Sequence, residues 1–163
     1  MPARKTQAIR LLDAKRIPYT ATVYGDAETF HSADEAAAIL GIPLSTMYKT
    51  LVVLRETRAK ATPLIVMIAS NTELDLKLLA SSLNEKKLRM STQKEAERLT
   101  GMQVGGISVL SLRNPAAFDI LIDERARDLE TIHISAGERG IEIALATTHL
   151  VALTSAKYVR ATA

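Results

Sequence analysis

The sequence contains no cysteine, and this excludes disulfide bonds, thiolate metal sites and a cysteine nucleophile. Aromatic residues are also scarce, with no tryptophan, two phenylalanines and four tyrosines. A protein that stacks on several nucleotide bases would need more aromatic side chains than these. No apolar run approaches the ~18 residues of a membrane span, and the charged N-terminal stretch lacks the apolar core of a signal peptide. We therefore expect a cytoplasmic protein without a membrane partner.

The sequence also lacks the common signatures of catalytic and metal sites. The patterns H-E-x-x-H, G-x-S-x-G and G-x-G-x-x-G and the P-loop are all absent. The three histidines, His31, His133 and His149, have no partner at a spacing that suggests a metal site. The net charge of +3 permits a polyanionic partner without requiring one. We expect neither a metal nor a cofactor, and the sequence shows no obvious nucleophile.

The pattern that is present is that of a globular protein, and its length and 47% hydrophobic content favour a single domain over residues 1–163. Periodicity and capping signals predict helices over residues 4–15, 34–40, 73–83, 92–101 and 147–156. Strands are predicted over residues 19–24, 47–54, 64–69, 87–90, 107–112, 118–123, 131–135, 141–145 and 157–160. The second and third of these strands should pair as a hairpin with a long polar loop. Because helices and strands mix without a regular βαβ alternation, we expect an α+β fold with a mixed or partly closed sheet.

The stretch MYKTLVV, residues 47–53, places a lysine in an apolar strand. With period 2, Lys49 shares a face with Met47, Leu51 and Val53, which we expect to be buried. A buried ammonium without a partner is costly, so two interpretations stay open. In one, the stem of Lys49 covers apolar surface and the ammonium reaches water. In the other, Lys49 lines a cleft and meets an anion or a polarised carbonyl of a ligand.

Two glycine-containing segments could also border a ligand. TGMQVGGISVL, residues 100–110, carries Gly105 and Gly106 at the start of an expected strand, where paired glycines let a ligand approach backbone N–H groups. HISAGERG, residues 133–140, places Gly137 in a charged turn next to a serine. Each segment also has a purely structural interpretation, as a strand bulge in the first and a hairpin turn in the second.

Three motifs in this order, MYKTLVV, TGMQVGGIS and IHISAGERGIEI, resemble those of the YbaK/ProX family of aminoacyl-tRNA deacylases. The family includes Cys-tRNA(Pro) deacylases and the editing domains associated with prolyl-tRNA synthetase. LDLKLLA, residues 74–80, and the opening helix–strand unit are similar too, so the resemblance spans residues 6–160. It implies an α+β fold in a single compact domain, with a mixed sheet curled into a small barrel and flanked by helices.

The resemblance also implies which residues form the site. The essential lysine of the family falls on Lys49, which would be the catalytic residue and hold the terminal phosphate or the developing oxyanion. The substrate-binding positions fall on Tyr24, Thr50, Gly105, Gly106, Ser135, Gly137 and Glu142. Glu142 stands where some members have an aspartate, so its extra methylene group is expected to reshape the pocket.

The activity implied by the resemblance is trans-editing of mischarged tRNA, foremost Cys-tRNA(Pro). In that branch the substrate thiol attacks its own carbonyl and leaves as a cyclic thioester, so no protein nucleophile is needed. Alternatives stay open: hydrolytic deacylation of Ala- or Ser-charged tRNA, a non-catalytic module that binds tRNA ends or nucleotides, and a small-molecule hydrolase unrelated to tRNA. The expected partner is the acceptor end of an aminoacyl-tRNA, with prolyl-tRNA synthetase as a candidate protein partner.

Overall fold

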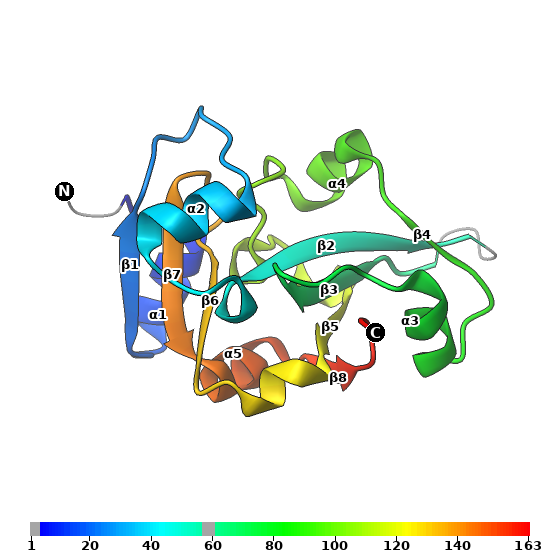
Figure 1. The fold of residues 1–163 in the computed structure, drawn as a ribbon. Coiled ribbons are helices and arrows are strands. Elements are labelled where there is room, and N and C mark those ends of the chain that lie inside the picture. The colour runs from blue at the N-terminus through cyan, green and yellow to red at the C-terminus, as the bar shows by residue number, and fades with distance from the viewer. Residues whose placement is uncertain (1–3, 57–60) are drawn as a thin grey trace.

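Two β-sheets form the frame of the molecule, seen here in a computed structural model (Figure 1). The structure describes residues 4–56 and 61–163. The first sheet is antiparallel, with the order β1-β7-β6, and its strands are β1 (Tyr19–Val23), β6 (Thr131–Ser135) and β7 (Ile141–Ala146). The second sheet has the order β4-β2-β3-β5-β8 and consists of β2 (Tyr48–Arg55), β3 (Leu64–Ala69), β4 (Leu88–Met90), β5 (Asp119–Asp123) and β8 (Lys157–Val159).

The second sheet is mixed, because β2 pairs antiparallel with β3 and β4, whereas β3, β5 and β8 run parallel. The expected α+β class is thus confirmed. The expected barrel is wrong: in the described residues the two sheets meet at one isolated bridge, between Met47 and His133, and do not close. A barrel needs a continuous ladder of hydrogen bonds around its circumference. Here the edge strands β4 and β8 have only three residues each, too few to carry such a ladder onward.

The five predicted helices are confirmed, with bounds that differ by a few residues from those expected. They are α1 (Gln7–Ala14), α2 (Ala33–Leu40), α3 (Leu76–Ser82), α4 (Gln93–Thr100) and α5 (Thr147–Thr154). Ser32 and Thr92 begin α2 and α4 with the predicted capping boxes, in which Glu35 and Glu95 bond back to the cap residue. A glycine in the left-handed conformation ends each of these two helices. None of the helices in the described part of the chain is long and apolar enough to cross a membrane.

The strand expected over residues 107–112 is wrong, since this segment forms a 3-10 turn, η2 (Val109–Ser111). Ser111 ties the turn to two distant segments, because its hydroxyl accepts a hydrogen bond from the N–H of Ala8 and donates one to the carbonyl of Ala136. A short apolar run can be buried as a strand or as a turn, so periodicity alone does not distinguish them. The partners available in the folded chain decide the outcome.

The predicted hairpin of β2 and β3 is confirmed, with a register that runs from Tyr48 opposite Ala69 to Val53 opposite Leu64. Part of the polar loop between the two strands, residues 57–60, lies outside the described residues.

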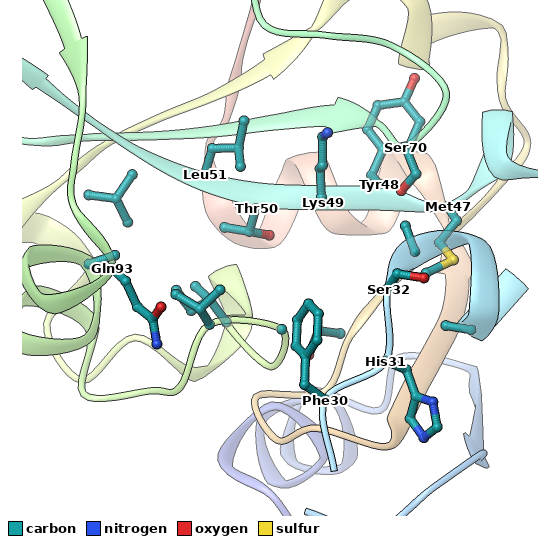
Figure 2. A pocket seen from close by; sticks show the side chains of 18 of the residues that line it. Phe30, His31, Ser32, Met47, Tyr48, Lys49, Thr50, Leu51, Ser70 and Gln93 are labelled. Atoms are coloured by element: carbon teal, nitrogen blue, oxygen red, sulfur yellow. The ribbon is translucent and has the colours of Figure 1, made fainter. Parts of the chain in front are cut away.

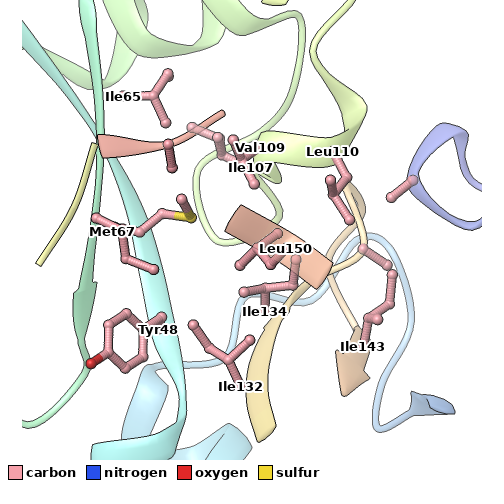
Figure 3. Packing of buried hydrophobic residues seen from close by; sticks show 14 of the residues in the cluster. Tyr48, Ile65, Met67, Ile107, Val109, Leu110, Ile132, Ile134, Ile143 and Leu150 are labelled. Carbon is pink, nitrogen blue, oxygen red and sulfur yellow. The ribbon is translucent and has the colours of Figure 1, made fainter. Parts of the chain in front are cut away.

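The five-stranded sheet separates two apolar clusters. The larger cluster lies between the two sheets (Figure 3) and includes Ile65, Met67, Ile132, Ile134, Ile143 and Leu150. The smaller cluster covers the opposite face of the five-stranded sheet, beneath α3. β2 contributes Tyr48 and Val52 to the larger cluster and Val53 to the smaller one. Lys49 lies on the same face as Val53, as the alternation along the strand predicts.

Candidate functional site

A cavity of about 380 Å³ lies beside β2 (Figure 2). Its walls come from β2, the loop before α2, the residues around the start of α4 and the glycine segment after α4. Side chains from β6 and β7 complete the lining. Small-molecule sites in proteins span roughly 300–1,000 Å³. The cavity is therefore large enough for a small ligand or for the end of a larger one.

The cavity opens where one edge of β2 lacks a neighbouring strand. β4 pairs only with Val53–Arg55, and the bridge from Met47 to β6 lies at the other end of β2. Between these two points, no strand of the described residues pairs along this edge. On the β4 side the gap ends where the N–H of Ser91 donates to the carbonyl of Val52 at 3.0 Å. Residues from both faces of β2 therefore contribute to the lining.

Lys49 and Thr50 leave β2 in opposite directions, because successive side chains of a strand alternate. Figure 2 shows Thr50 on the side of Phe30 and Gln93, and Lys49 on the side of Leu51. Both residues line the cavity, and both are half-buried. Lys49 forms no ion pair with another described residue. Its positive charge is therefore available to an anionic group of a ligand.

Glu142 brings a carboxyl group to the cavity from β7. The residue is only 5% exposed, and in the described part of the chain no group donates a hydrogen bond to its carboxylate. Burial raises the pKa of Glu142 to about 8, so the carboxyl is largely protonated at neutral pH. Burial also raises the pKa of Tyr24, and the charge of Glu142 adds to this effect. A buried carboxyl without a partner is suited to a hydrogen-bond donor or a cation of a ligand.

The first residues of two helices border the cavity as well. Ser32 and Ala33 at the start of α2, and Thr92 and Gln93 at the start of α4, contribute to its lining. The N-terminal end of a helix carries partial positive charge. This charge is offset in part by the glutamates of the two capping boxes. The helix ends make this part of the cavity favourable for an anionic group.

The glycine segments enter the site only in part. Gly105 lines the cavity, whereas Gly106 and Gly137 are not among the lining residues. The N–H of Gly106 donates to the carbonyl of Gln103 at 2.9 Å, and that of Gly137 donates to Ser135 Oγ at 3.2 Å. A Cβ on Gly106 would lie 2.7 Å from a backbone nitrogen of the turn between β6 and β7. These two glycines permit close packing, and their N–H groups are engaged within the protein.

The structure brings six of the eight expected site positions to one cavity. They are Tyr24, Lys49, Thr50, Gly105, Ser135 and Glu142. The β6–β7 register places Ser135 directly opposite Glu142, seven positions further along the sequence. In the described residues, no three His, Asp or Glu side chains lie close enough together to hold a metal ion.

Sequence reasoning missed Phe30 and Gln93, which line the cavity from the loop before α2 and from α4. The sequence contains one indication for Phe30: it is one of two phenylalanines, and it stands in a polar loop two residues before a helix-capping serine. Its side chain is indeed exposed, at 54%. Gln93 carried no such signal, because a polar residue is common in the first turn of a helix.

Comparison with known proteins relates the chain to the editing of aminoacyl-tRNA. A model of the aminoacyl-tRNA editing domain family matches residues 27–153. EbsC of Enterococcus faecalis, provisionally described as a Cys-tRNA(Pro)/Cys-tRNA(Cys) deacylase, is 33% identical over 159 residues. This match covers 98% of the present chain and 94% of EbsC.

Other similarities cover a ligase segment and a solved fold. The proline–tRNA ligase of Pediococcus pentosaceus is 26% identical over 113 residues, which covers 69% of this chain but 19% of the ligase. A crystal structure provisionally described as a trans-editing enzyme for prolyl tRNA synthetase superposes with a TM-score of 0.77. That match covers 99% of both chains at 21% identity, so it shows agreement of the folds.

Proposed function

The chain belongs to the aminoacyl-tRNA editing domain family, and we propose that it is a trans-editing deacylase that removes cysteine from tRNA for proline. The observation that carries this proposal is the convergence of an unpaired cation, Lys49, and an unpartnered buried carboxyl, Glu142, in one cavity. The end of an aminoacyl-tRNA offers complementary groups, namely phosphates, an ester carbonyl and an α-ammonium. The similarity to EbsC supports cysteine as the amino acid.

Lys49 is the catalytic residue in this proposal. Its ammonium binds the terminal phosphate or the oxyanion that develops at the ester carbonyl. The helix ends of α2 and α4 add partial positive charge on the side of the cavity that faces Thr50. Because this charge is held in place before the substrate arrives, it also positions the ester for reaction. An aminoacyl ester is already activated, so the enzyme has a smaller barrier to lower than with an amide.

Ser135 and Glu142 are proposed to hold the aminoacyl group from β6 and β7. The carboxyl of Glu142 would receive the α-ammonium and release its proton on binding, because a nearby cation lowers the pKa of a carboxyl group. Tyr24 and Thr50 would orient the ester or the terminal ribose. Gly105, which has no Cβ, leaves room for the ligand beside its backbone.

Gly106 and Gly137 are proposed to contribute to the site indirectly. Their N–H groups are already engaged, so their role is to let the turns that carry Gly105 and Ser135 pack closely. An alanine at either position would displace those turns and, with them, the cavity wall.

The cleavage step needs no nucleophile from the protein. The thiol of the cysteinyl group attacks its own carbonyl carbon, the ester bond breaks, and the thiol proton passes to the departing ribose oxygen. The products are a cyclic thioester and a tRNA with a free terminal hydroxyl. With water as the nucleophile instead, the same cavity would release alanine or serine as the free amino acid.

Prolyl-tRNA synthetase is the candidate protein partner. Proline–tRNA ligases contain a segment similar to this chain. If that segment is also a deacylase, the ligases carry the editing activity and the ligase activity in one protein. Association of the separate chain with the synthetase would place the deacylase close to newly mischarged tRNA. Co-purification of the two proteins, with and without charged tRNA, measures this association.

A panel of charged tRNAs tests the proposed activity. Cysteinyl-, alanyl- and seryl-tRNA for proline are incubated with the full chain, and the products are separated into thiolactone and free amino acid. We expect the cysteinyl substrate to react fastest and to give thiolactone. Free cysteine as the only product would contradict the thiol-assisted route, and a faster reaction with the alanyl or seryl substrate would contradict the assigned amino acid. Binding of all three without deacylation would show a non-catalytic module.

Lys49→Ala tests the catalytic role. We expect kcat/KM to fall by about 10²- to 10³-fold, the loss that follows removal of an oxyanion-stabilising group. Lys94→Ala is the matched control, since Lys94 is an exposed lysine next to Gln93 that does not line the cavity. This control should keep its activity, and both variants should retain the wild-type free energy of unfolding to within about 1 kcal/mol. An active Lys49→Ala variant would refute the assignment.

A further inference from the structure

Phe30 presents an aromatic ring at the cavity. Among the described residues, Phe30, Ile39 and Met90 are the large apolar side chains that remain exposed, and Phe30 is 54% exposed. Figure 2 shows the ring directed from the loop before α2 toward β2. An exposed aromatic ring that lines a cavity has a free surface on which a ligand can pack.

The ring has a fixed position. Arg139 Cζ lies 5.3 Å from the ring centroid, and Arg139 Nε donates to the carbonyl of Val104 at 2.8 Å. Gly105 lies against the ring, since a Cβ there would be 2.8 Å from Phe30 Cδ2. Two backbone N–H groups of the same loop donate to Asp26 Oδ1 at 3.0 and 2.7 Å, which fixes the chain ahead of the ring. Phe30 is thus supported by its neighbours while more than half of its surface stays open.

We propose that Phe30, supported by Arg139, is a stacking platform for the terminal adenine base of the substrate. This inference rests on the proposed function, which places the aminoacyl ester in the cavity between Lys49 and Glu142. The nucleoside joined to that ester must then occupy adjacent space, and Phe30 offers the exposed ring there. Stacking recognises the flat face of a base without reading its hydrogen-bonding edge. Because every tRNA ends in adenosine, the platform supplies affinity that all tRNAs share and leaves the choice of amino acid to the cavity.

The surroundings of Phe30 favour a nucleotide over a protein surface. The exposed apolar area is a single ring on a polar loop, far smaller than the patches on which proteins dock. Arg139 adds a positive charge behind the ring, and this charge attracts the phosphates that accompany a base. One ring of this kind matches one base, which agrees with the small number of aromatic residues in the chain.

A fluorescence titration tests the platform directly. The chain has no tryptophan, so Phe30→Trp introduces a single reporter, and Ile39→Trp is the matched control at a side chain that is 55% exposed and does not line the cavity. With adenosine 5′-monophosphate we expect saturable quenching in Phe30→Trp and none in Ile39→Trp. Ribose 5-phosphate, which has the phosphate but no base, should leave both unchanged. No quenching by the nucleotide, or equal quenching by ribose 5-phosphate, overturns the proposal.

Steady-state kinetics gives a second readout. We expect Phe30→Ala to raise KM for cysteinyl-tRNA by about 5- to 100-fold with little change in kcat, the effect of losing one base–aromatic stack. Phe30→Tyr keeps the ring and should keep the wild-type KM. An unchanged KM in Phe30→Ala overturns the platform. Quenching without deacylation by the wild type would contradict the proposed function alone, and deacylation without quenching would contradict only the platform.

Discussion

Two buried carboxyl groups of this protein have opposite surroundings. Asp123, at the end of β5, is 1% exposed and accepts hydrogen bonds from the N–H of Ala161 at 2.9 Å and from the N–H and hydroxyl of Thr162 at 3.2 and 3.1 Å. Glu142, in β7, is 5% exposed and receives none from the described residues. The two carboxyl groups are buried to nearly the same extent, so they differ in the number of hydrogen bonds that they accept. A satisfied carboxyl stabilises the fold, whereas an unsatisfied one beside a cavity is available to a ligand.

The contrast extends to the regions around the two groups. Asp123 joins the C-terminal residues to the five-stranded sheet, and the carbonyl of Ala161 accepts a further bond from the N–H of Asp75 at 2.8 Å, just before α3. Hydrogen bonds within the protein thus join three segments that are distant in sequence: the end of β5, the start of α3 and the C-terminal residues. Around Glu142, by contrast, Lys49 and Phe30 also retain an unpaired charge and an exposed ring. Groups that could still bind a ligand, namely a carboxyl, an ammonium and an aromatic ring, are therefore concentrated at the cavity.

Asp123→Ala is expected to have the largest effect on stability, a loss of about 3 kcal/mol in the free energy of unfolding. The donors of Ala161 and Thr162 would be buried without an acceptor. Urea unfolding measures the loss, with Asp128→Ala, at an exposed position of the following 3-10 turn, as a control expected to change by less than about 0.5 kcal/mol. Deacylation per folded molecule should stay unchanged, because Asp123 does not line the cavity. If Asp123→Ala had the stability of the wild type, the hydrogen bonds that Asp123 accepts would not stabilise the fold, and the contrast with Glu142 would be wrong.

Glu142→Gln is expected to change stability in the opposite direction, with a gain of about 1 to 3 kcal/mol near pH 8. The pKa of Glu142 is about 8 in the folded chain and near its ordinary value of 4.5 in the unfolded chain. Between these values the unfolded chain has lost a proton that the folded chain keeps. Wild-type stability therefore falls as the pH rises through this window, by at most about 1.4 kcal/mol per pH unit. Glutamine cannot ionise, so this contribution disappears.

The measurement is the free energy of unfolding of both proteins at several pH values between about 5 and 8. A pH slope in Glu142→Gln as steep as that of the wild type would show that Glu142 is not the titrating group. The same variant should raise KM for cysteinyl-tRNA by about 10-fold, since it loses a charge-assisted hydrogen bond to the α-ammonium. An unchanged KM would mean that the carboxyl does not contact the substrate.

Glu142→Asp is expected to have the smallest effect, a loss of about 1 kcal/mol in stability from the missing methylene group. The shorter side chain enlarges the cavity, so the ratio of kcat/KM for cysteinyl- and alanyl-tRNA should shift by about 10-fold or less. Competition between the two charged tRNAs measures this ratio. If it does not move while stability changes, Glu142 does not shape the part of the cavity that distinguishes amino acids.

The sequence predicted which residues belong to the site better than it predicted how they are arranged in space. The motif resemblance led to Lys49, Thr50 and Glu142, and all three line the cavity. It did not show that the edge of β2 beside Lys49 and Thr50 is open, which follows from the short pairing of β4 with β2. It also missed Phe30, whose importance depends on contacts with Arg139 and Gly105, residues far along the chain.

By itself the sequence determined the features that depend only on residues close to one another in the chain. The capping boxes that begin at Ser32 and Thr92 and the alternation along β2 are of this kind, because their hydrogen bonds and side-chain directions are set locally. Only the tertiary structure decided that residues 107–112 form a turn, that the two sheets stay open, and that Glu142 is buried without a partner. The physical reason is that the partner of a buried group is selected by packing between distant segments, which no local pattern specifies.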